Sequence, residues 1–412
     1  MKKKLKKYLK WSERYTETDM SYIAKGSFWL VLTKAGLLLA SFLTMLAFGN
    51  LLSAEAFGTY QYIISATVIA GVFSLNGINT AIVKSVARGK EGTFWRGAKE
   101  RFRWSLIGSA GLLAGAGWYF FAGNMLLAGG FLIAGLLMPG EKIFQMFTNF
   151  WNGRKDFKTR AGYHLSAVFL SLLVVIPVIY WTDNVVTIIF AYFLSHVLFE
   201  GLFFFKTLHH AKNDAVDEPA ISFGKNLSIM SGFSMIASHI DKVIVWQFLG
   251  PVQVAIYSFA VLPINKLRGA IPITDLALPK LGEKDMTKKR QRGILKKMWK
   301  LLLLFISIGV ILALIAPYIY ELFFPKYLES IIYFQALAAL IAISGPIALL
   351  NSGLIAEAKT RSLYVVNIAS PLLKIALFVG LIPFYGIWGM VWAILFSEVF
   401  RGVLLLYFFN KI

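Results

Sequence analysis

The stretch at residues 27–49, SFWLVLTKAGLLLASFLTMLAFG, decides how the chain is interpreted. Its length and apolar composition suit a helix that crosses a lipid bilayer. Lys34 lies well inside this apolar run, where a charge costs about 2.5–3.5 kcal/mol on insertion scales. Either its stem extends back to the lipid headgroups, or its ammonium faces a polar interior. This helix alone favours neither interpretation.

The composition indicates a membrane protein built from many such helices. Of 412 residues, 58% are hydrophobic and 15% are aromatic, which is more apolar than a typical soluble protein. The chain has no cysteine, so disulfides, thiolate metal sites and cysteine nucleophiles are excluded. The start, MKKKLKKYLKWSERY, lacks the apolar core of a signal peptide. We predict that residues 1–22 form a basic, amphipathic segment.

Windows of about 20 apolar residues predict twelve transmembrane helices and thus an all-α, polytopic membrane protein. Prolines are expected to kink or break the fourth, eighth and tenth of these helices, at Pro139, at Pro263 and Pro272, and at Pro346. The predicted spans are 27–49, 59–82, 104–122, 125–150, 161–181 and 185–205, followed by 222–248, 253–278, 299–323, 330–354, 363–384 and 387–409.

Lysine and arginine are concentrated in alternate loops. They crowd the N-terminal tail and the connections around 83–103 and 279–298, whereas the loops on the opposite side carry only Lys326. This alternation is the positive-inside pattern, so we predict a multi-pass protein of the cytoplasmic membrane with both termini in the cytoplasm. The net charge of +21 follows this alternation. Nucleic acid, which would need one continuous basic face, is therefore not an expected partner.

Two short matches indicate an internal repeat. Residues 52–60, LSAEAFGTY, align with 249–257, LGPVQVAIY, and the pattern KTRxxY at 158–163 recurs at 359–364. Both pairs are offset by about 200 residues and fall at equivalent hairpins, as expected for duplicated halves.

The repeat predicts two six-helix bundles, at 23–207 and 222–412, joined by a cytoplasmic linker at 208–221. Because each half has an even number of helices, the two share one topology. They are then related by a pseudo-twofold axis along the membrane normal.

Polar residues form a stripe on the first helix of each predicted bundle, and the repeat lays one stripe on the other. A lysine that merely extends to the headgroups would not require this correspondence, so we predict that Lys34 faces a cavity. Asp241 either takes part in ion coupling or closes an outer helix end with Lys242. The stripes contain Lys34, Ser41 and Thr44 in the first half, and Ser231, Ser238 and Asp241 in the second.

Other basic residues lie deep in predicted helices. Lys374 sits near the bilayer midplane with no acidic residue within one turn, on a face shared with Asn367 and Ser370. Lys266 and Arg268 lie at a comparable depth. If these cations line one cavity, its charge is positive, and a phosphate or pyrophosphate is the natural ligand.

Two further pairs of intramembrane charges have structural explanations. Glu398 and Arg401 stand at i and i+3, so we predict an ion pair that neutralises both. His196 and Glu200 lie one turn apart. They either carry protons or form a satisfied buried pair, and the second interpretation is favoured.

Four passages carry a resemblance to a known family: KGSFWLVLTKAG, AEAFGTYQYIISATVIAGVFSLNGINTAIVKSVARGK, HIDKVIVWQFLGPVQVAIYSFA and LIPFYGIWGMVWAILFSE. The chain resembles the polysaccharide-repeat-unit (Wzx-type) flippases of the multidrug/oligosaccharidyl-lipid/polysaccharide transporter superfamily. The resemblance implies two six-helix bundles around a cationic cavity that opens alternately to each side. By helix and residue type, the family's cavity cations correspond to Lys34, Arg268 and Lys374, and its embedded acid to Asp241. Twelve spans rather than fourteen separate the chain from the lipid II flippase branch. Several prolines expected to kink helices do not match the family's pattern.

The resulting hypothesis is a flippase for a polyprenyl-pyrophosphate-linked oligosaccharide, such as an O-antigen unit. Lys34, Lys266, Arg268 and Lys374 would contact the substrate, and membrane lipids and other glycan-assembly membrane proteins would be partners. No cofactor or metal is expected. A cation-coupled multidrug exporter of the same superfamily would need an acidic cavity. A glycan polymerase or ligase would need substantial outer loops, and no motif of an enzyme is present.

Overall fold

The computed structural model describes an all-α chain, with no strand among the residues that it describes. Most of the predicted N-terminal segment lies outside these residues, as does Pro272. The described residues are 20–271, 273, 277, 281, 287–357 and 359–411.

The helices of the first half follow the six predicted spans in order, and two spans are interrupted. The helix of the second span begins at Ala54 and not at 59, and that of the third begins at Thr93, before the predicted apolar span at 104. The elements are α2 (Met20–Leu51), α3 (Ala54–Ala70), η1 (Gly71–Ser74), α4 (Ile78–Ala87), α5 (Thr93–Phe121), α6 (Met125–Phe144), α7 (Phe147–Gly153), α8 (Phe157–Trp181) and α9 (Val185–Leu208).

The second half also follows its six predicted spans. Its last helix bends at Gly386, where φ is 56° and ψ is −135°, a conformation that favours glycine. The predicted spans 363–384 and 387–409 meet at this residue, so the twelve-helix prediction is confirmed. The elements are α10 (Glu218–Leu249), α11 (Pro251–Ala270), α13 (Lys288–Phe323), η2 (Pro325–Tyr327), α14 (Ser330–Leu337), α15 (Ala339–Ala356) and α16 (Thr360–Asn410).

The interruptions do not all occur where proline predicted them. Helix α6 runs through Pro139 and ends soon after it, whereas α11 and α15 continue past Pro263 and Pro346. The second span has no proline, and yet it breaks between α3 and α4 at Leu75, whose φ is 54°. A continuous helix over 59–82 was therefore wrong. The cause is tertiary and lies in the contacts of Arg101 described below.

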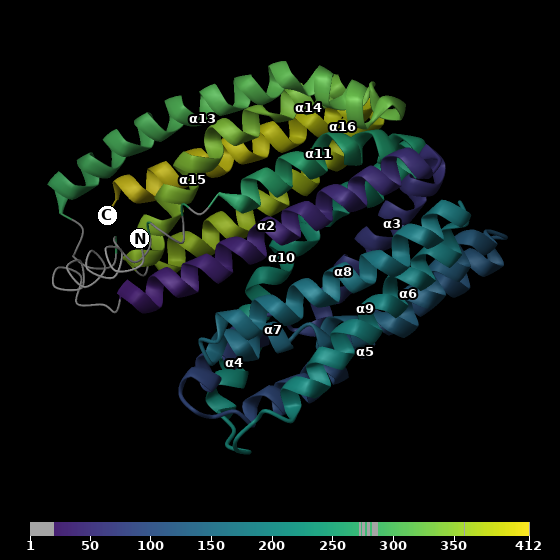
Figure 1. Cartoon of the computed structure of the whole chain (residues 1–412). Coiled ribbons are helices and arrows are strands. Elements are labelled where there is room, and N and C mark those ends of the chain that lie inside the picture. The colour runs from purple at the N-terminus through teal and green to yellow at the C-terminus, as the bar shows by residue number, and fades with distance from the viewer. Residues whose placement is uncertain are drawn as a thin grey trace, which may run out of the picture.

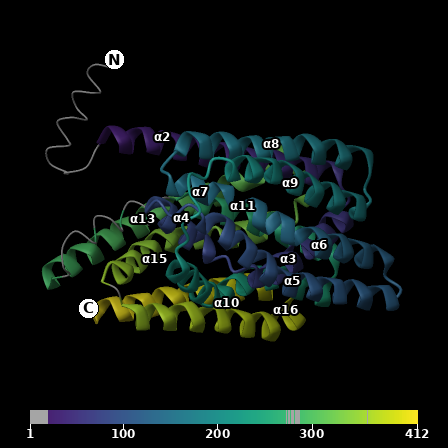
Figure 2. The same ribbon diagram turned by 90° about the horizontal axis from the view of Figure 1, so that it is seen from below.

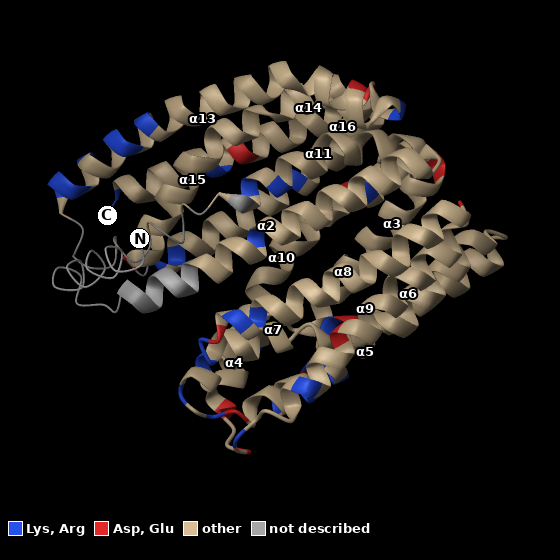
Figure 3. Cartoon of the chain, in the orientation of Figure 1, with Lys and Arg blue, Asp and Glu red and all other residues tan. Residues whose placement is uncertain are grey.

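The helices form two groups that diverge toward the end where both termini lie (Figure 1). Helices α5, α6, α8 and α9 pack in one group, and α13, α14, α15 and α16 in the other. Helix α2 lies along α8, and α10 lies along α16, as Figure 2 shows from below. Lys and Arg gather at the end of the termini (Figure 3). Among the described helices, eight have the length and composition of membrane spans, α16 being counted once.

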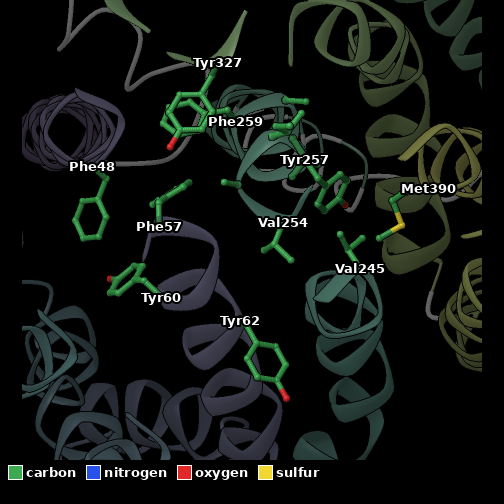
Figure 4. Packing of buried hydrophobic residues seen from close by; sticks show 14 of the residues in the cluster. Phe48, Phe57, Tyr60, Tyr62, Val245, Val254, Tyr257, Phe259, Tyr327 and Met390 are labelled. Atoms are coloured by element: carbon green, nitrogen blue, oxygen red, sulfur yellow. The ribbon is translucent and has the colours of Figure 1, made fainter. Parts of the chain in front are cut away.

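The two groups join at the end opposite the termini through an aromatic cluster (Figure 4). The ring of Phe259 on α11 stacks on Tyr327 at a centroid distance of 3.8 Å, and Phe57 on α3 lies 5.0 Å from Phe259. Gly58 allows α3 to approach α11 closely, because a Cβ atom there would lie 1.8 Å from the carbonyl oxygen of Pro251. The two halves therefore pack directly against each other at that end.

At the basic end, the segment before α10 is fastened to the first half. The Arg154 guanidinium donates to both carboxylate oxygens of Glu91, at 2.7 and 2.6 Å, and the Lys212 amide donates to the same carboxylate at 2.6 Å. Asp217 accepts from the amide of Ala220 and so caps α10. The beginning of α10 is thus held by the first half, while its later part packs on α16.

Candidate functional site

A polar pocket of about 140 Å³ lies between α10 and α16. Helix α10 presents Ser234 and Ser238, which are one turn apart and therefore share a face. Both parts of α16 contribute to the wall, because the bend at Gly386 returns its second part alongside the first. The lining residues from α16 include Asn367, Ser370, Pro371 and Lys374 before the bend, and Ser397, Glu398 and Arg401 after it.

Lys374 is one of the two cations that line this pocket among the described residues. Its ammonium lies 5.2 Å from the centre of the Phe378 ring, a cation–π contact. Among the described residues, no carboxylate oxygen lies within 4.0 Å of its nitrogen. The nearby Ser370 hydroxyl is buried and also has no hydrogen-bond partner there. The pocket therefore offers unused donors, which suit an anionic group.

Arg268, on α11, contacts the pocket-lining residue Glu398 and differs from the partner that the sequence predicted for it. Its Nε donates to Ser344 Oγ at 2.9 Å, and its Nη2 lies 3.1 Å from Glu398 Oε1. The prediction paired Glu398 with Arg401, and this was wrong. Arg401 lines the same pocket and interacts electrostatically with Glu398, but the close ion pair joins α16 to α11. Arg268, on another helix, thus lies closer to the Glu398 carboxylate than Arg401 does, although Arg401 is on the same helix as Glu398.

Asp241 is already satisfied by its surroundings. It is buried and accepts a hydrogen bond of 2.6 Å from the Tyr257 hydroxyl on α11 and one of 2.8 Å from the Lys242 amide. The Lys242 ammonium lies 3.9 Å from the same carboxylate. This arrangement joins α10 to α11 and leaves little capacity for another ligand.

Lys34 and Lys266 do not line this pocket. Both are exposed in the chain, on α2 and α11 respectively. In the predicted stripes, the hydroxyl of Thr44 donates to the Ala40 carbonyl and that of Ser238 to the Ser234 carbonyl, each within its own helix. The structure thus brings Arg268 and Lys374 together around Glu398 and leaves the two other predicted cations outside.

A second polar cluster lies within the first half, between α6 and α9. The ammonium of Lys142 lies 2.8 Å from Glu141, and Gln145 donates to Glu141 at 3.1 Å. Glu200 is only 7% exposed, and its Oε2 has no hydrogen-bond partner among the described residues. His196 hydrogen-bonds the carbonyl of its own helix at Tyr192 instead. The prediction of a satisfied His196–Glu200 pair was therefore wrong.

Arg101 is a buried cation that the sequence analysis placed in a loop. It is 1% exposed and donates at 2.8 Å to the Ser74 carbonyl, to Asn76 Oδ1 and to Asn79 Oδ1. These bonds satisfy polar groups that the break between α3 and α4 leaves free. The two asparagines flanking Gly77 in SLNGIN were the available signal, because such residues favour turns.

These features define an all-helical membrane protein with a cationic pocket in its second half, and solved structures share its fold. An inward-facing multidrug resistance MATE family transporter of the MOP superfamily gives a TM-score of 0.63 at 16% identity, covering 94% of this chain and 97% of that chain. The lipid II flippase MurJ, in an inward closed conformation, gives 0.65 at 15% identity, covering 93% and 87%. A MOP superfamily transporter from Pyrococcus furiosus, described with a binding pocket of reverse polarity, gives 0.63 at 16% identity, covering 95% of each chain.

The chain therefore has the same fold as these transporters and this flippase. The protein family described as "Polysaccharide biosynthesis protein" matches residues 23–115, which include most of α2, all of α3 and α4, and most of α5. A search of curated protein sequences found no match. The superfamily that the sequence resembles is thus confirmed at the level of the fold.

Proposed function

We propose that the protein translocates a polyprenyl-pyrophosphate-linked oligosaccharide across the cytoplasmic membrane, with the pyrophosphate held by cations of the second half. The observation that carries this proposal is the excess of positive charge around the pocket. Both carboxylates there already have a cationic partner, so a diphosphate would supply the missing negative charge. Lys374, Arg401 and Glu398 line the pocket. Lys242, Arg268 and Asp241 lie behind this lining and interact electrostatically with Lys374.

The pocket is large enough for only the charged part of the substrate. A pocket of about 140 Å³ is smaller than the roughly 300–1,000 Å³ of sites that enclose a drug-sized ligand. It accommodates a phosphate group and not a glycan. The glycan would lie between the two halves, where the exposed Lys34 and Lys266 meet the substrate as it enters, and the lipid tail would stay in the bilayer.

Alternating access would come from movement of the two halves. The basic end faces the cytoplasm in this proposal, by the positive-inside rule. The halves meet at the opposite end through the aromatic cluster. In this proposal that contact would close the outer side of the transporter. The predicted bundles and their pseudo-twofold relation belong to the same proposal.

The comparisons with known proteins support this function, and they also support one alternative, a multidrug exporter. The match to a polysaccharide biosynthesis family and the likeness to a lipid II flippase favour a lipid-linked glycan. The multidrug transporters of the same fold favour an exporter of cationic drugs. The Pyrococcus furiosus protein is described with reverse pocket polarity, so charge is the feature that separates the two functions. Here the polarity is positive, which favours an anionic substrate.

Replacing Lys374 tests the proposal directly. In proteoliposomes, Lys374→Ala is expected to reduce translocation of a fluorescent lipid-linked oligosaccharide by about tenfold or more, because a charge-assisted contact is lost. Lys374→Arg keeps the charge and is expected to retain part of the activity. The matched control is Lys158→Ala at the exposed start of α8. Full translocation by Lys374→Ala, or export of a cationic dye that does not require Lys374, would overturn the assignment.

We propose Glu200, rather than Asp241, for ion coupling. A carboxyl that is buried without a donor is stable only when it takes up a proton or a cation, whereas Asp241 already accepts two hydrogen bonds. Glu200→Gln is expected to abolish acceleration of translocation by an imposed proton gradient while leaving the basal rate. Unchanged acceleration in this variant would exclude the role, and Glu55→Gln, at the exposed start of α3, is the control.

A further inference from the structure

Helix α13 is longer than a bilayer requires. Its 36 residues extend about 54 Å at 1.5 Å per residue, against a hydrocarbon core of about 30 Å. Apart from Trp299, its exposed apolar residues begin at Leu303 and end at Leu322, a length of about 28 Å. The part before Leu303 therefore projects beyond the hydrocarbon core on the basic side.

Packing fixes the rotation of this projecting part. Ile294 and Met298 are buried in a cluster with Leu350 and Leu405. The buried residues further along α13, such as Phe305, continue the same face at helical spacing. The opposite face of α13 is consequently directed away from the protein along its whole length.

Basic side chains occupy that outward face. Lys289, Lys296 and Lys300 are exposed and recur at seven and four residues, so they share a face. Counted at 100° per residue, the same face continues as the exposed Leu314 and Tyr318. The basic stripe, defined as Lys289, Lys296 and Lys300, is thus in line with the surface that contacts lipid tails. It does not line the polar pocket.

The surroundings of the stripe suit lipid headgroups. Trp299 is 60% exposed beside Lys300, and tryptophan is enriched at the level of the headgroups. Within the described part of the chain, no carboxylate oxygen lies within 4.0 Å of the three stripe ammonium groups. Among the described residues these charges therefore have no counter-ion, while an anionic leaflet would supply one over a screening length of about 8–10 Å.

We propose that the basic stripe of α13 binds the headgroups of anionic phospholipids in the leaflet on the side of the termini, separately from the transport site. Lys300 and Lys296 are about 6 Å apart along the axis and lie within the screening length of the headgroups. Lys289 is about 16 Å from Lys300. The contributions therefore fall in the order Lys300, Lys296, Lys289.

The test compares lipid preference in matched variants of the full chain. Each protein is reconstituted in phosphatidylcholine vesicles, and electron paramagnetic resonance measures how strongly spin-labelled phosphatidylglycerol associates relative to spin-labelled phosphatidylcholine. The triple variant Lys289→Gln, Lys296→Gln and Lys300→Gln is expected to lower this preference by about twofold or more. The control removes three positive charges from loops at the same end: Arg88→Gln, Lys90→Gln and Lys212→Gln.

The outcomes separate the proposal from its alternatives. Retention of the wild-type preference by the stripe variant would overturn it. An equal loss in the control would also overturn it, because net charge and not the stripe would then be responsible. Loss in the stripe variant alone, with the single Lys300→Gln giving a larger share than Lys289→Gln, is the result that the proposal requires. Translocation is not measured, so this result is independent of the proposed function.

Discussion

Two cations of this protein, the buried Arg101 in the first half and the half-buried Lys374 in the second, differ in what surrounds them. The donors of Arg101 are used by Ser74, Asn76 and Asn79 within the interior of the first half. Lys374 faces a pocket, with an aromatic ring as its close neighbour. Removing a charge from water costs several kcal/mol in either place. From this difference we infer that Arg101, whose donors are occupied by the protein, maintains the fold, whereas Lys374 is available to a ligand.

The largest expected effect comes from replacing Arg101. Arg101→Met leaves the Ser74 carbonyl and two asparagine side chains without donors in the interior, so we expect a loss of about 3–5 kcal/mol in unfolding free energy. Denaturant unfolding in detergent measures it. Lys99→Met, on the exposed face of the same helix, serves as the control. If both variants unfold alike, Arg101 is not the residue that stabilises the break.

Glu91, outside the membrane, is a second charged group whose hydrogen-bond partners are supplied by the protein. Burial raises the pKa of its carboxyl, but hydrogen bonds from the Arg154 guanidinium and the Lys212 amide lower it more, and the net pKa lies below its usual value. Its stabilising contribution is therefore complete above the pKa of an unfolded glutamate and is lost as pH falls through the lower pKa of the folded state.

We expect Glu91→Gln to cost about 2 kcal/mol at neutral pH, because charge-assisted hydrogen bonds are lost. The difference from the wild type should shrink as the medium is acidified below pH of about 4. Melting curves at several pH values measure this effect. A constant difference across that range would show that the ionised form contributes nothing.

The smallest expected effect on stability is that of Lys374. Lys374→Met removes a charge that has no close carboxylate partner, so we expect the unfolding free energy to stay within about 1 kcal/mol of the wild type, or to rise. The same denaturant experiment measures it beside Arg101→Met. A loss as large as that of Arg101→Met would contradict the distinction between the two cations.

The sequence predicted the helices well because apolar length is a local property. The twelve spans follow from windows of about 20 residues, and α9 and α16 show them nearly at the expected positions. Local rules were less successful at the breaks. The break at Leu75 depends on Arg101, a residue that is 26 positions away in the sequence.

The candidate site was predicted in part. Lys374 and Arg268 were identified because a charge deep in an apolar span requires an explanation, and the structure places both near Glu398. Lys34 was identified by the same reasoning, but it is exposed on α2 and does not line the pocket. Depth in a helix can be counted along the sequence, whereas the direction of a side chain depends on the helices that pack beside it.

The sequence by itself therefore determined the all-α membrane architecture, the alternation of basic loops and the list of costly buried charges. These features depend on the composition and spacing of residues along the chain, which determine directly which segments cross a bilayer and which loops stay on its basic side. Only the tertiary structure decided the partners of those charges. It paired Glu398 with Arg268, satisfied Asp241 with Tyr257, and left Lys374 open to the pocket. The physical reason is that ion pairs and hydrogen bonds act over a few ångströms, between atoms that helix packing brings together from distant parts of the chain.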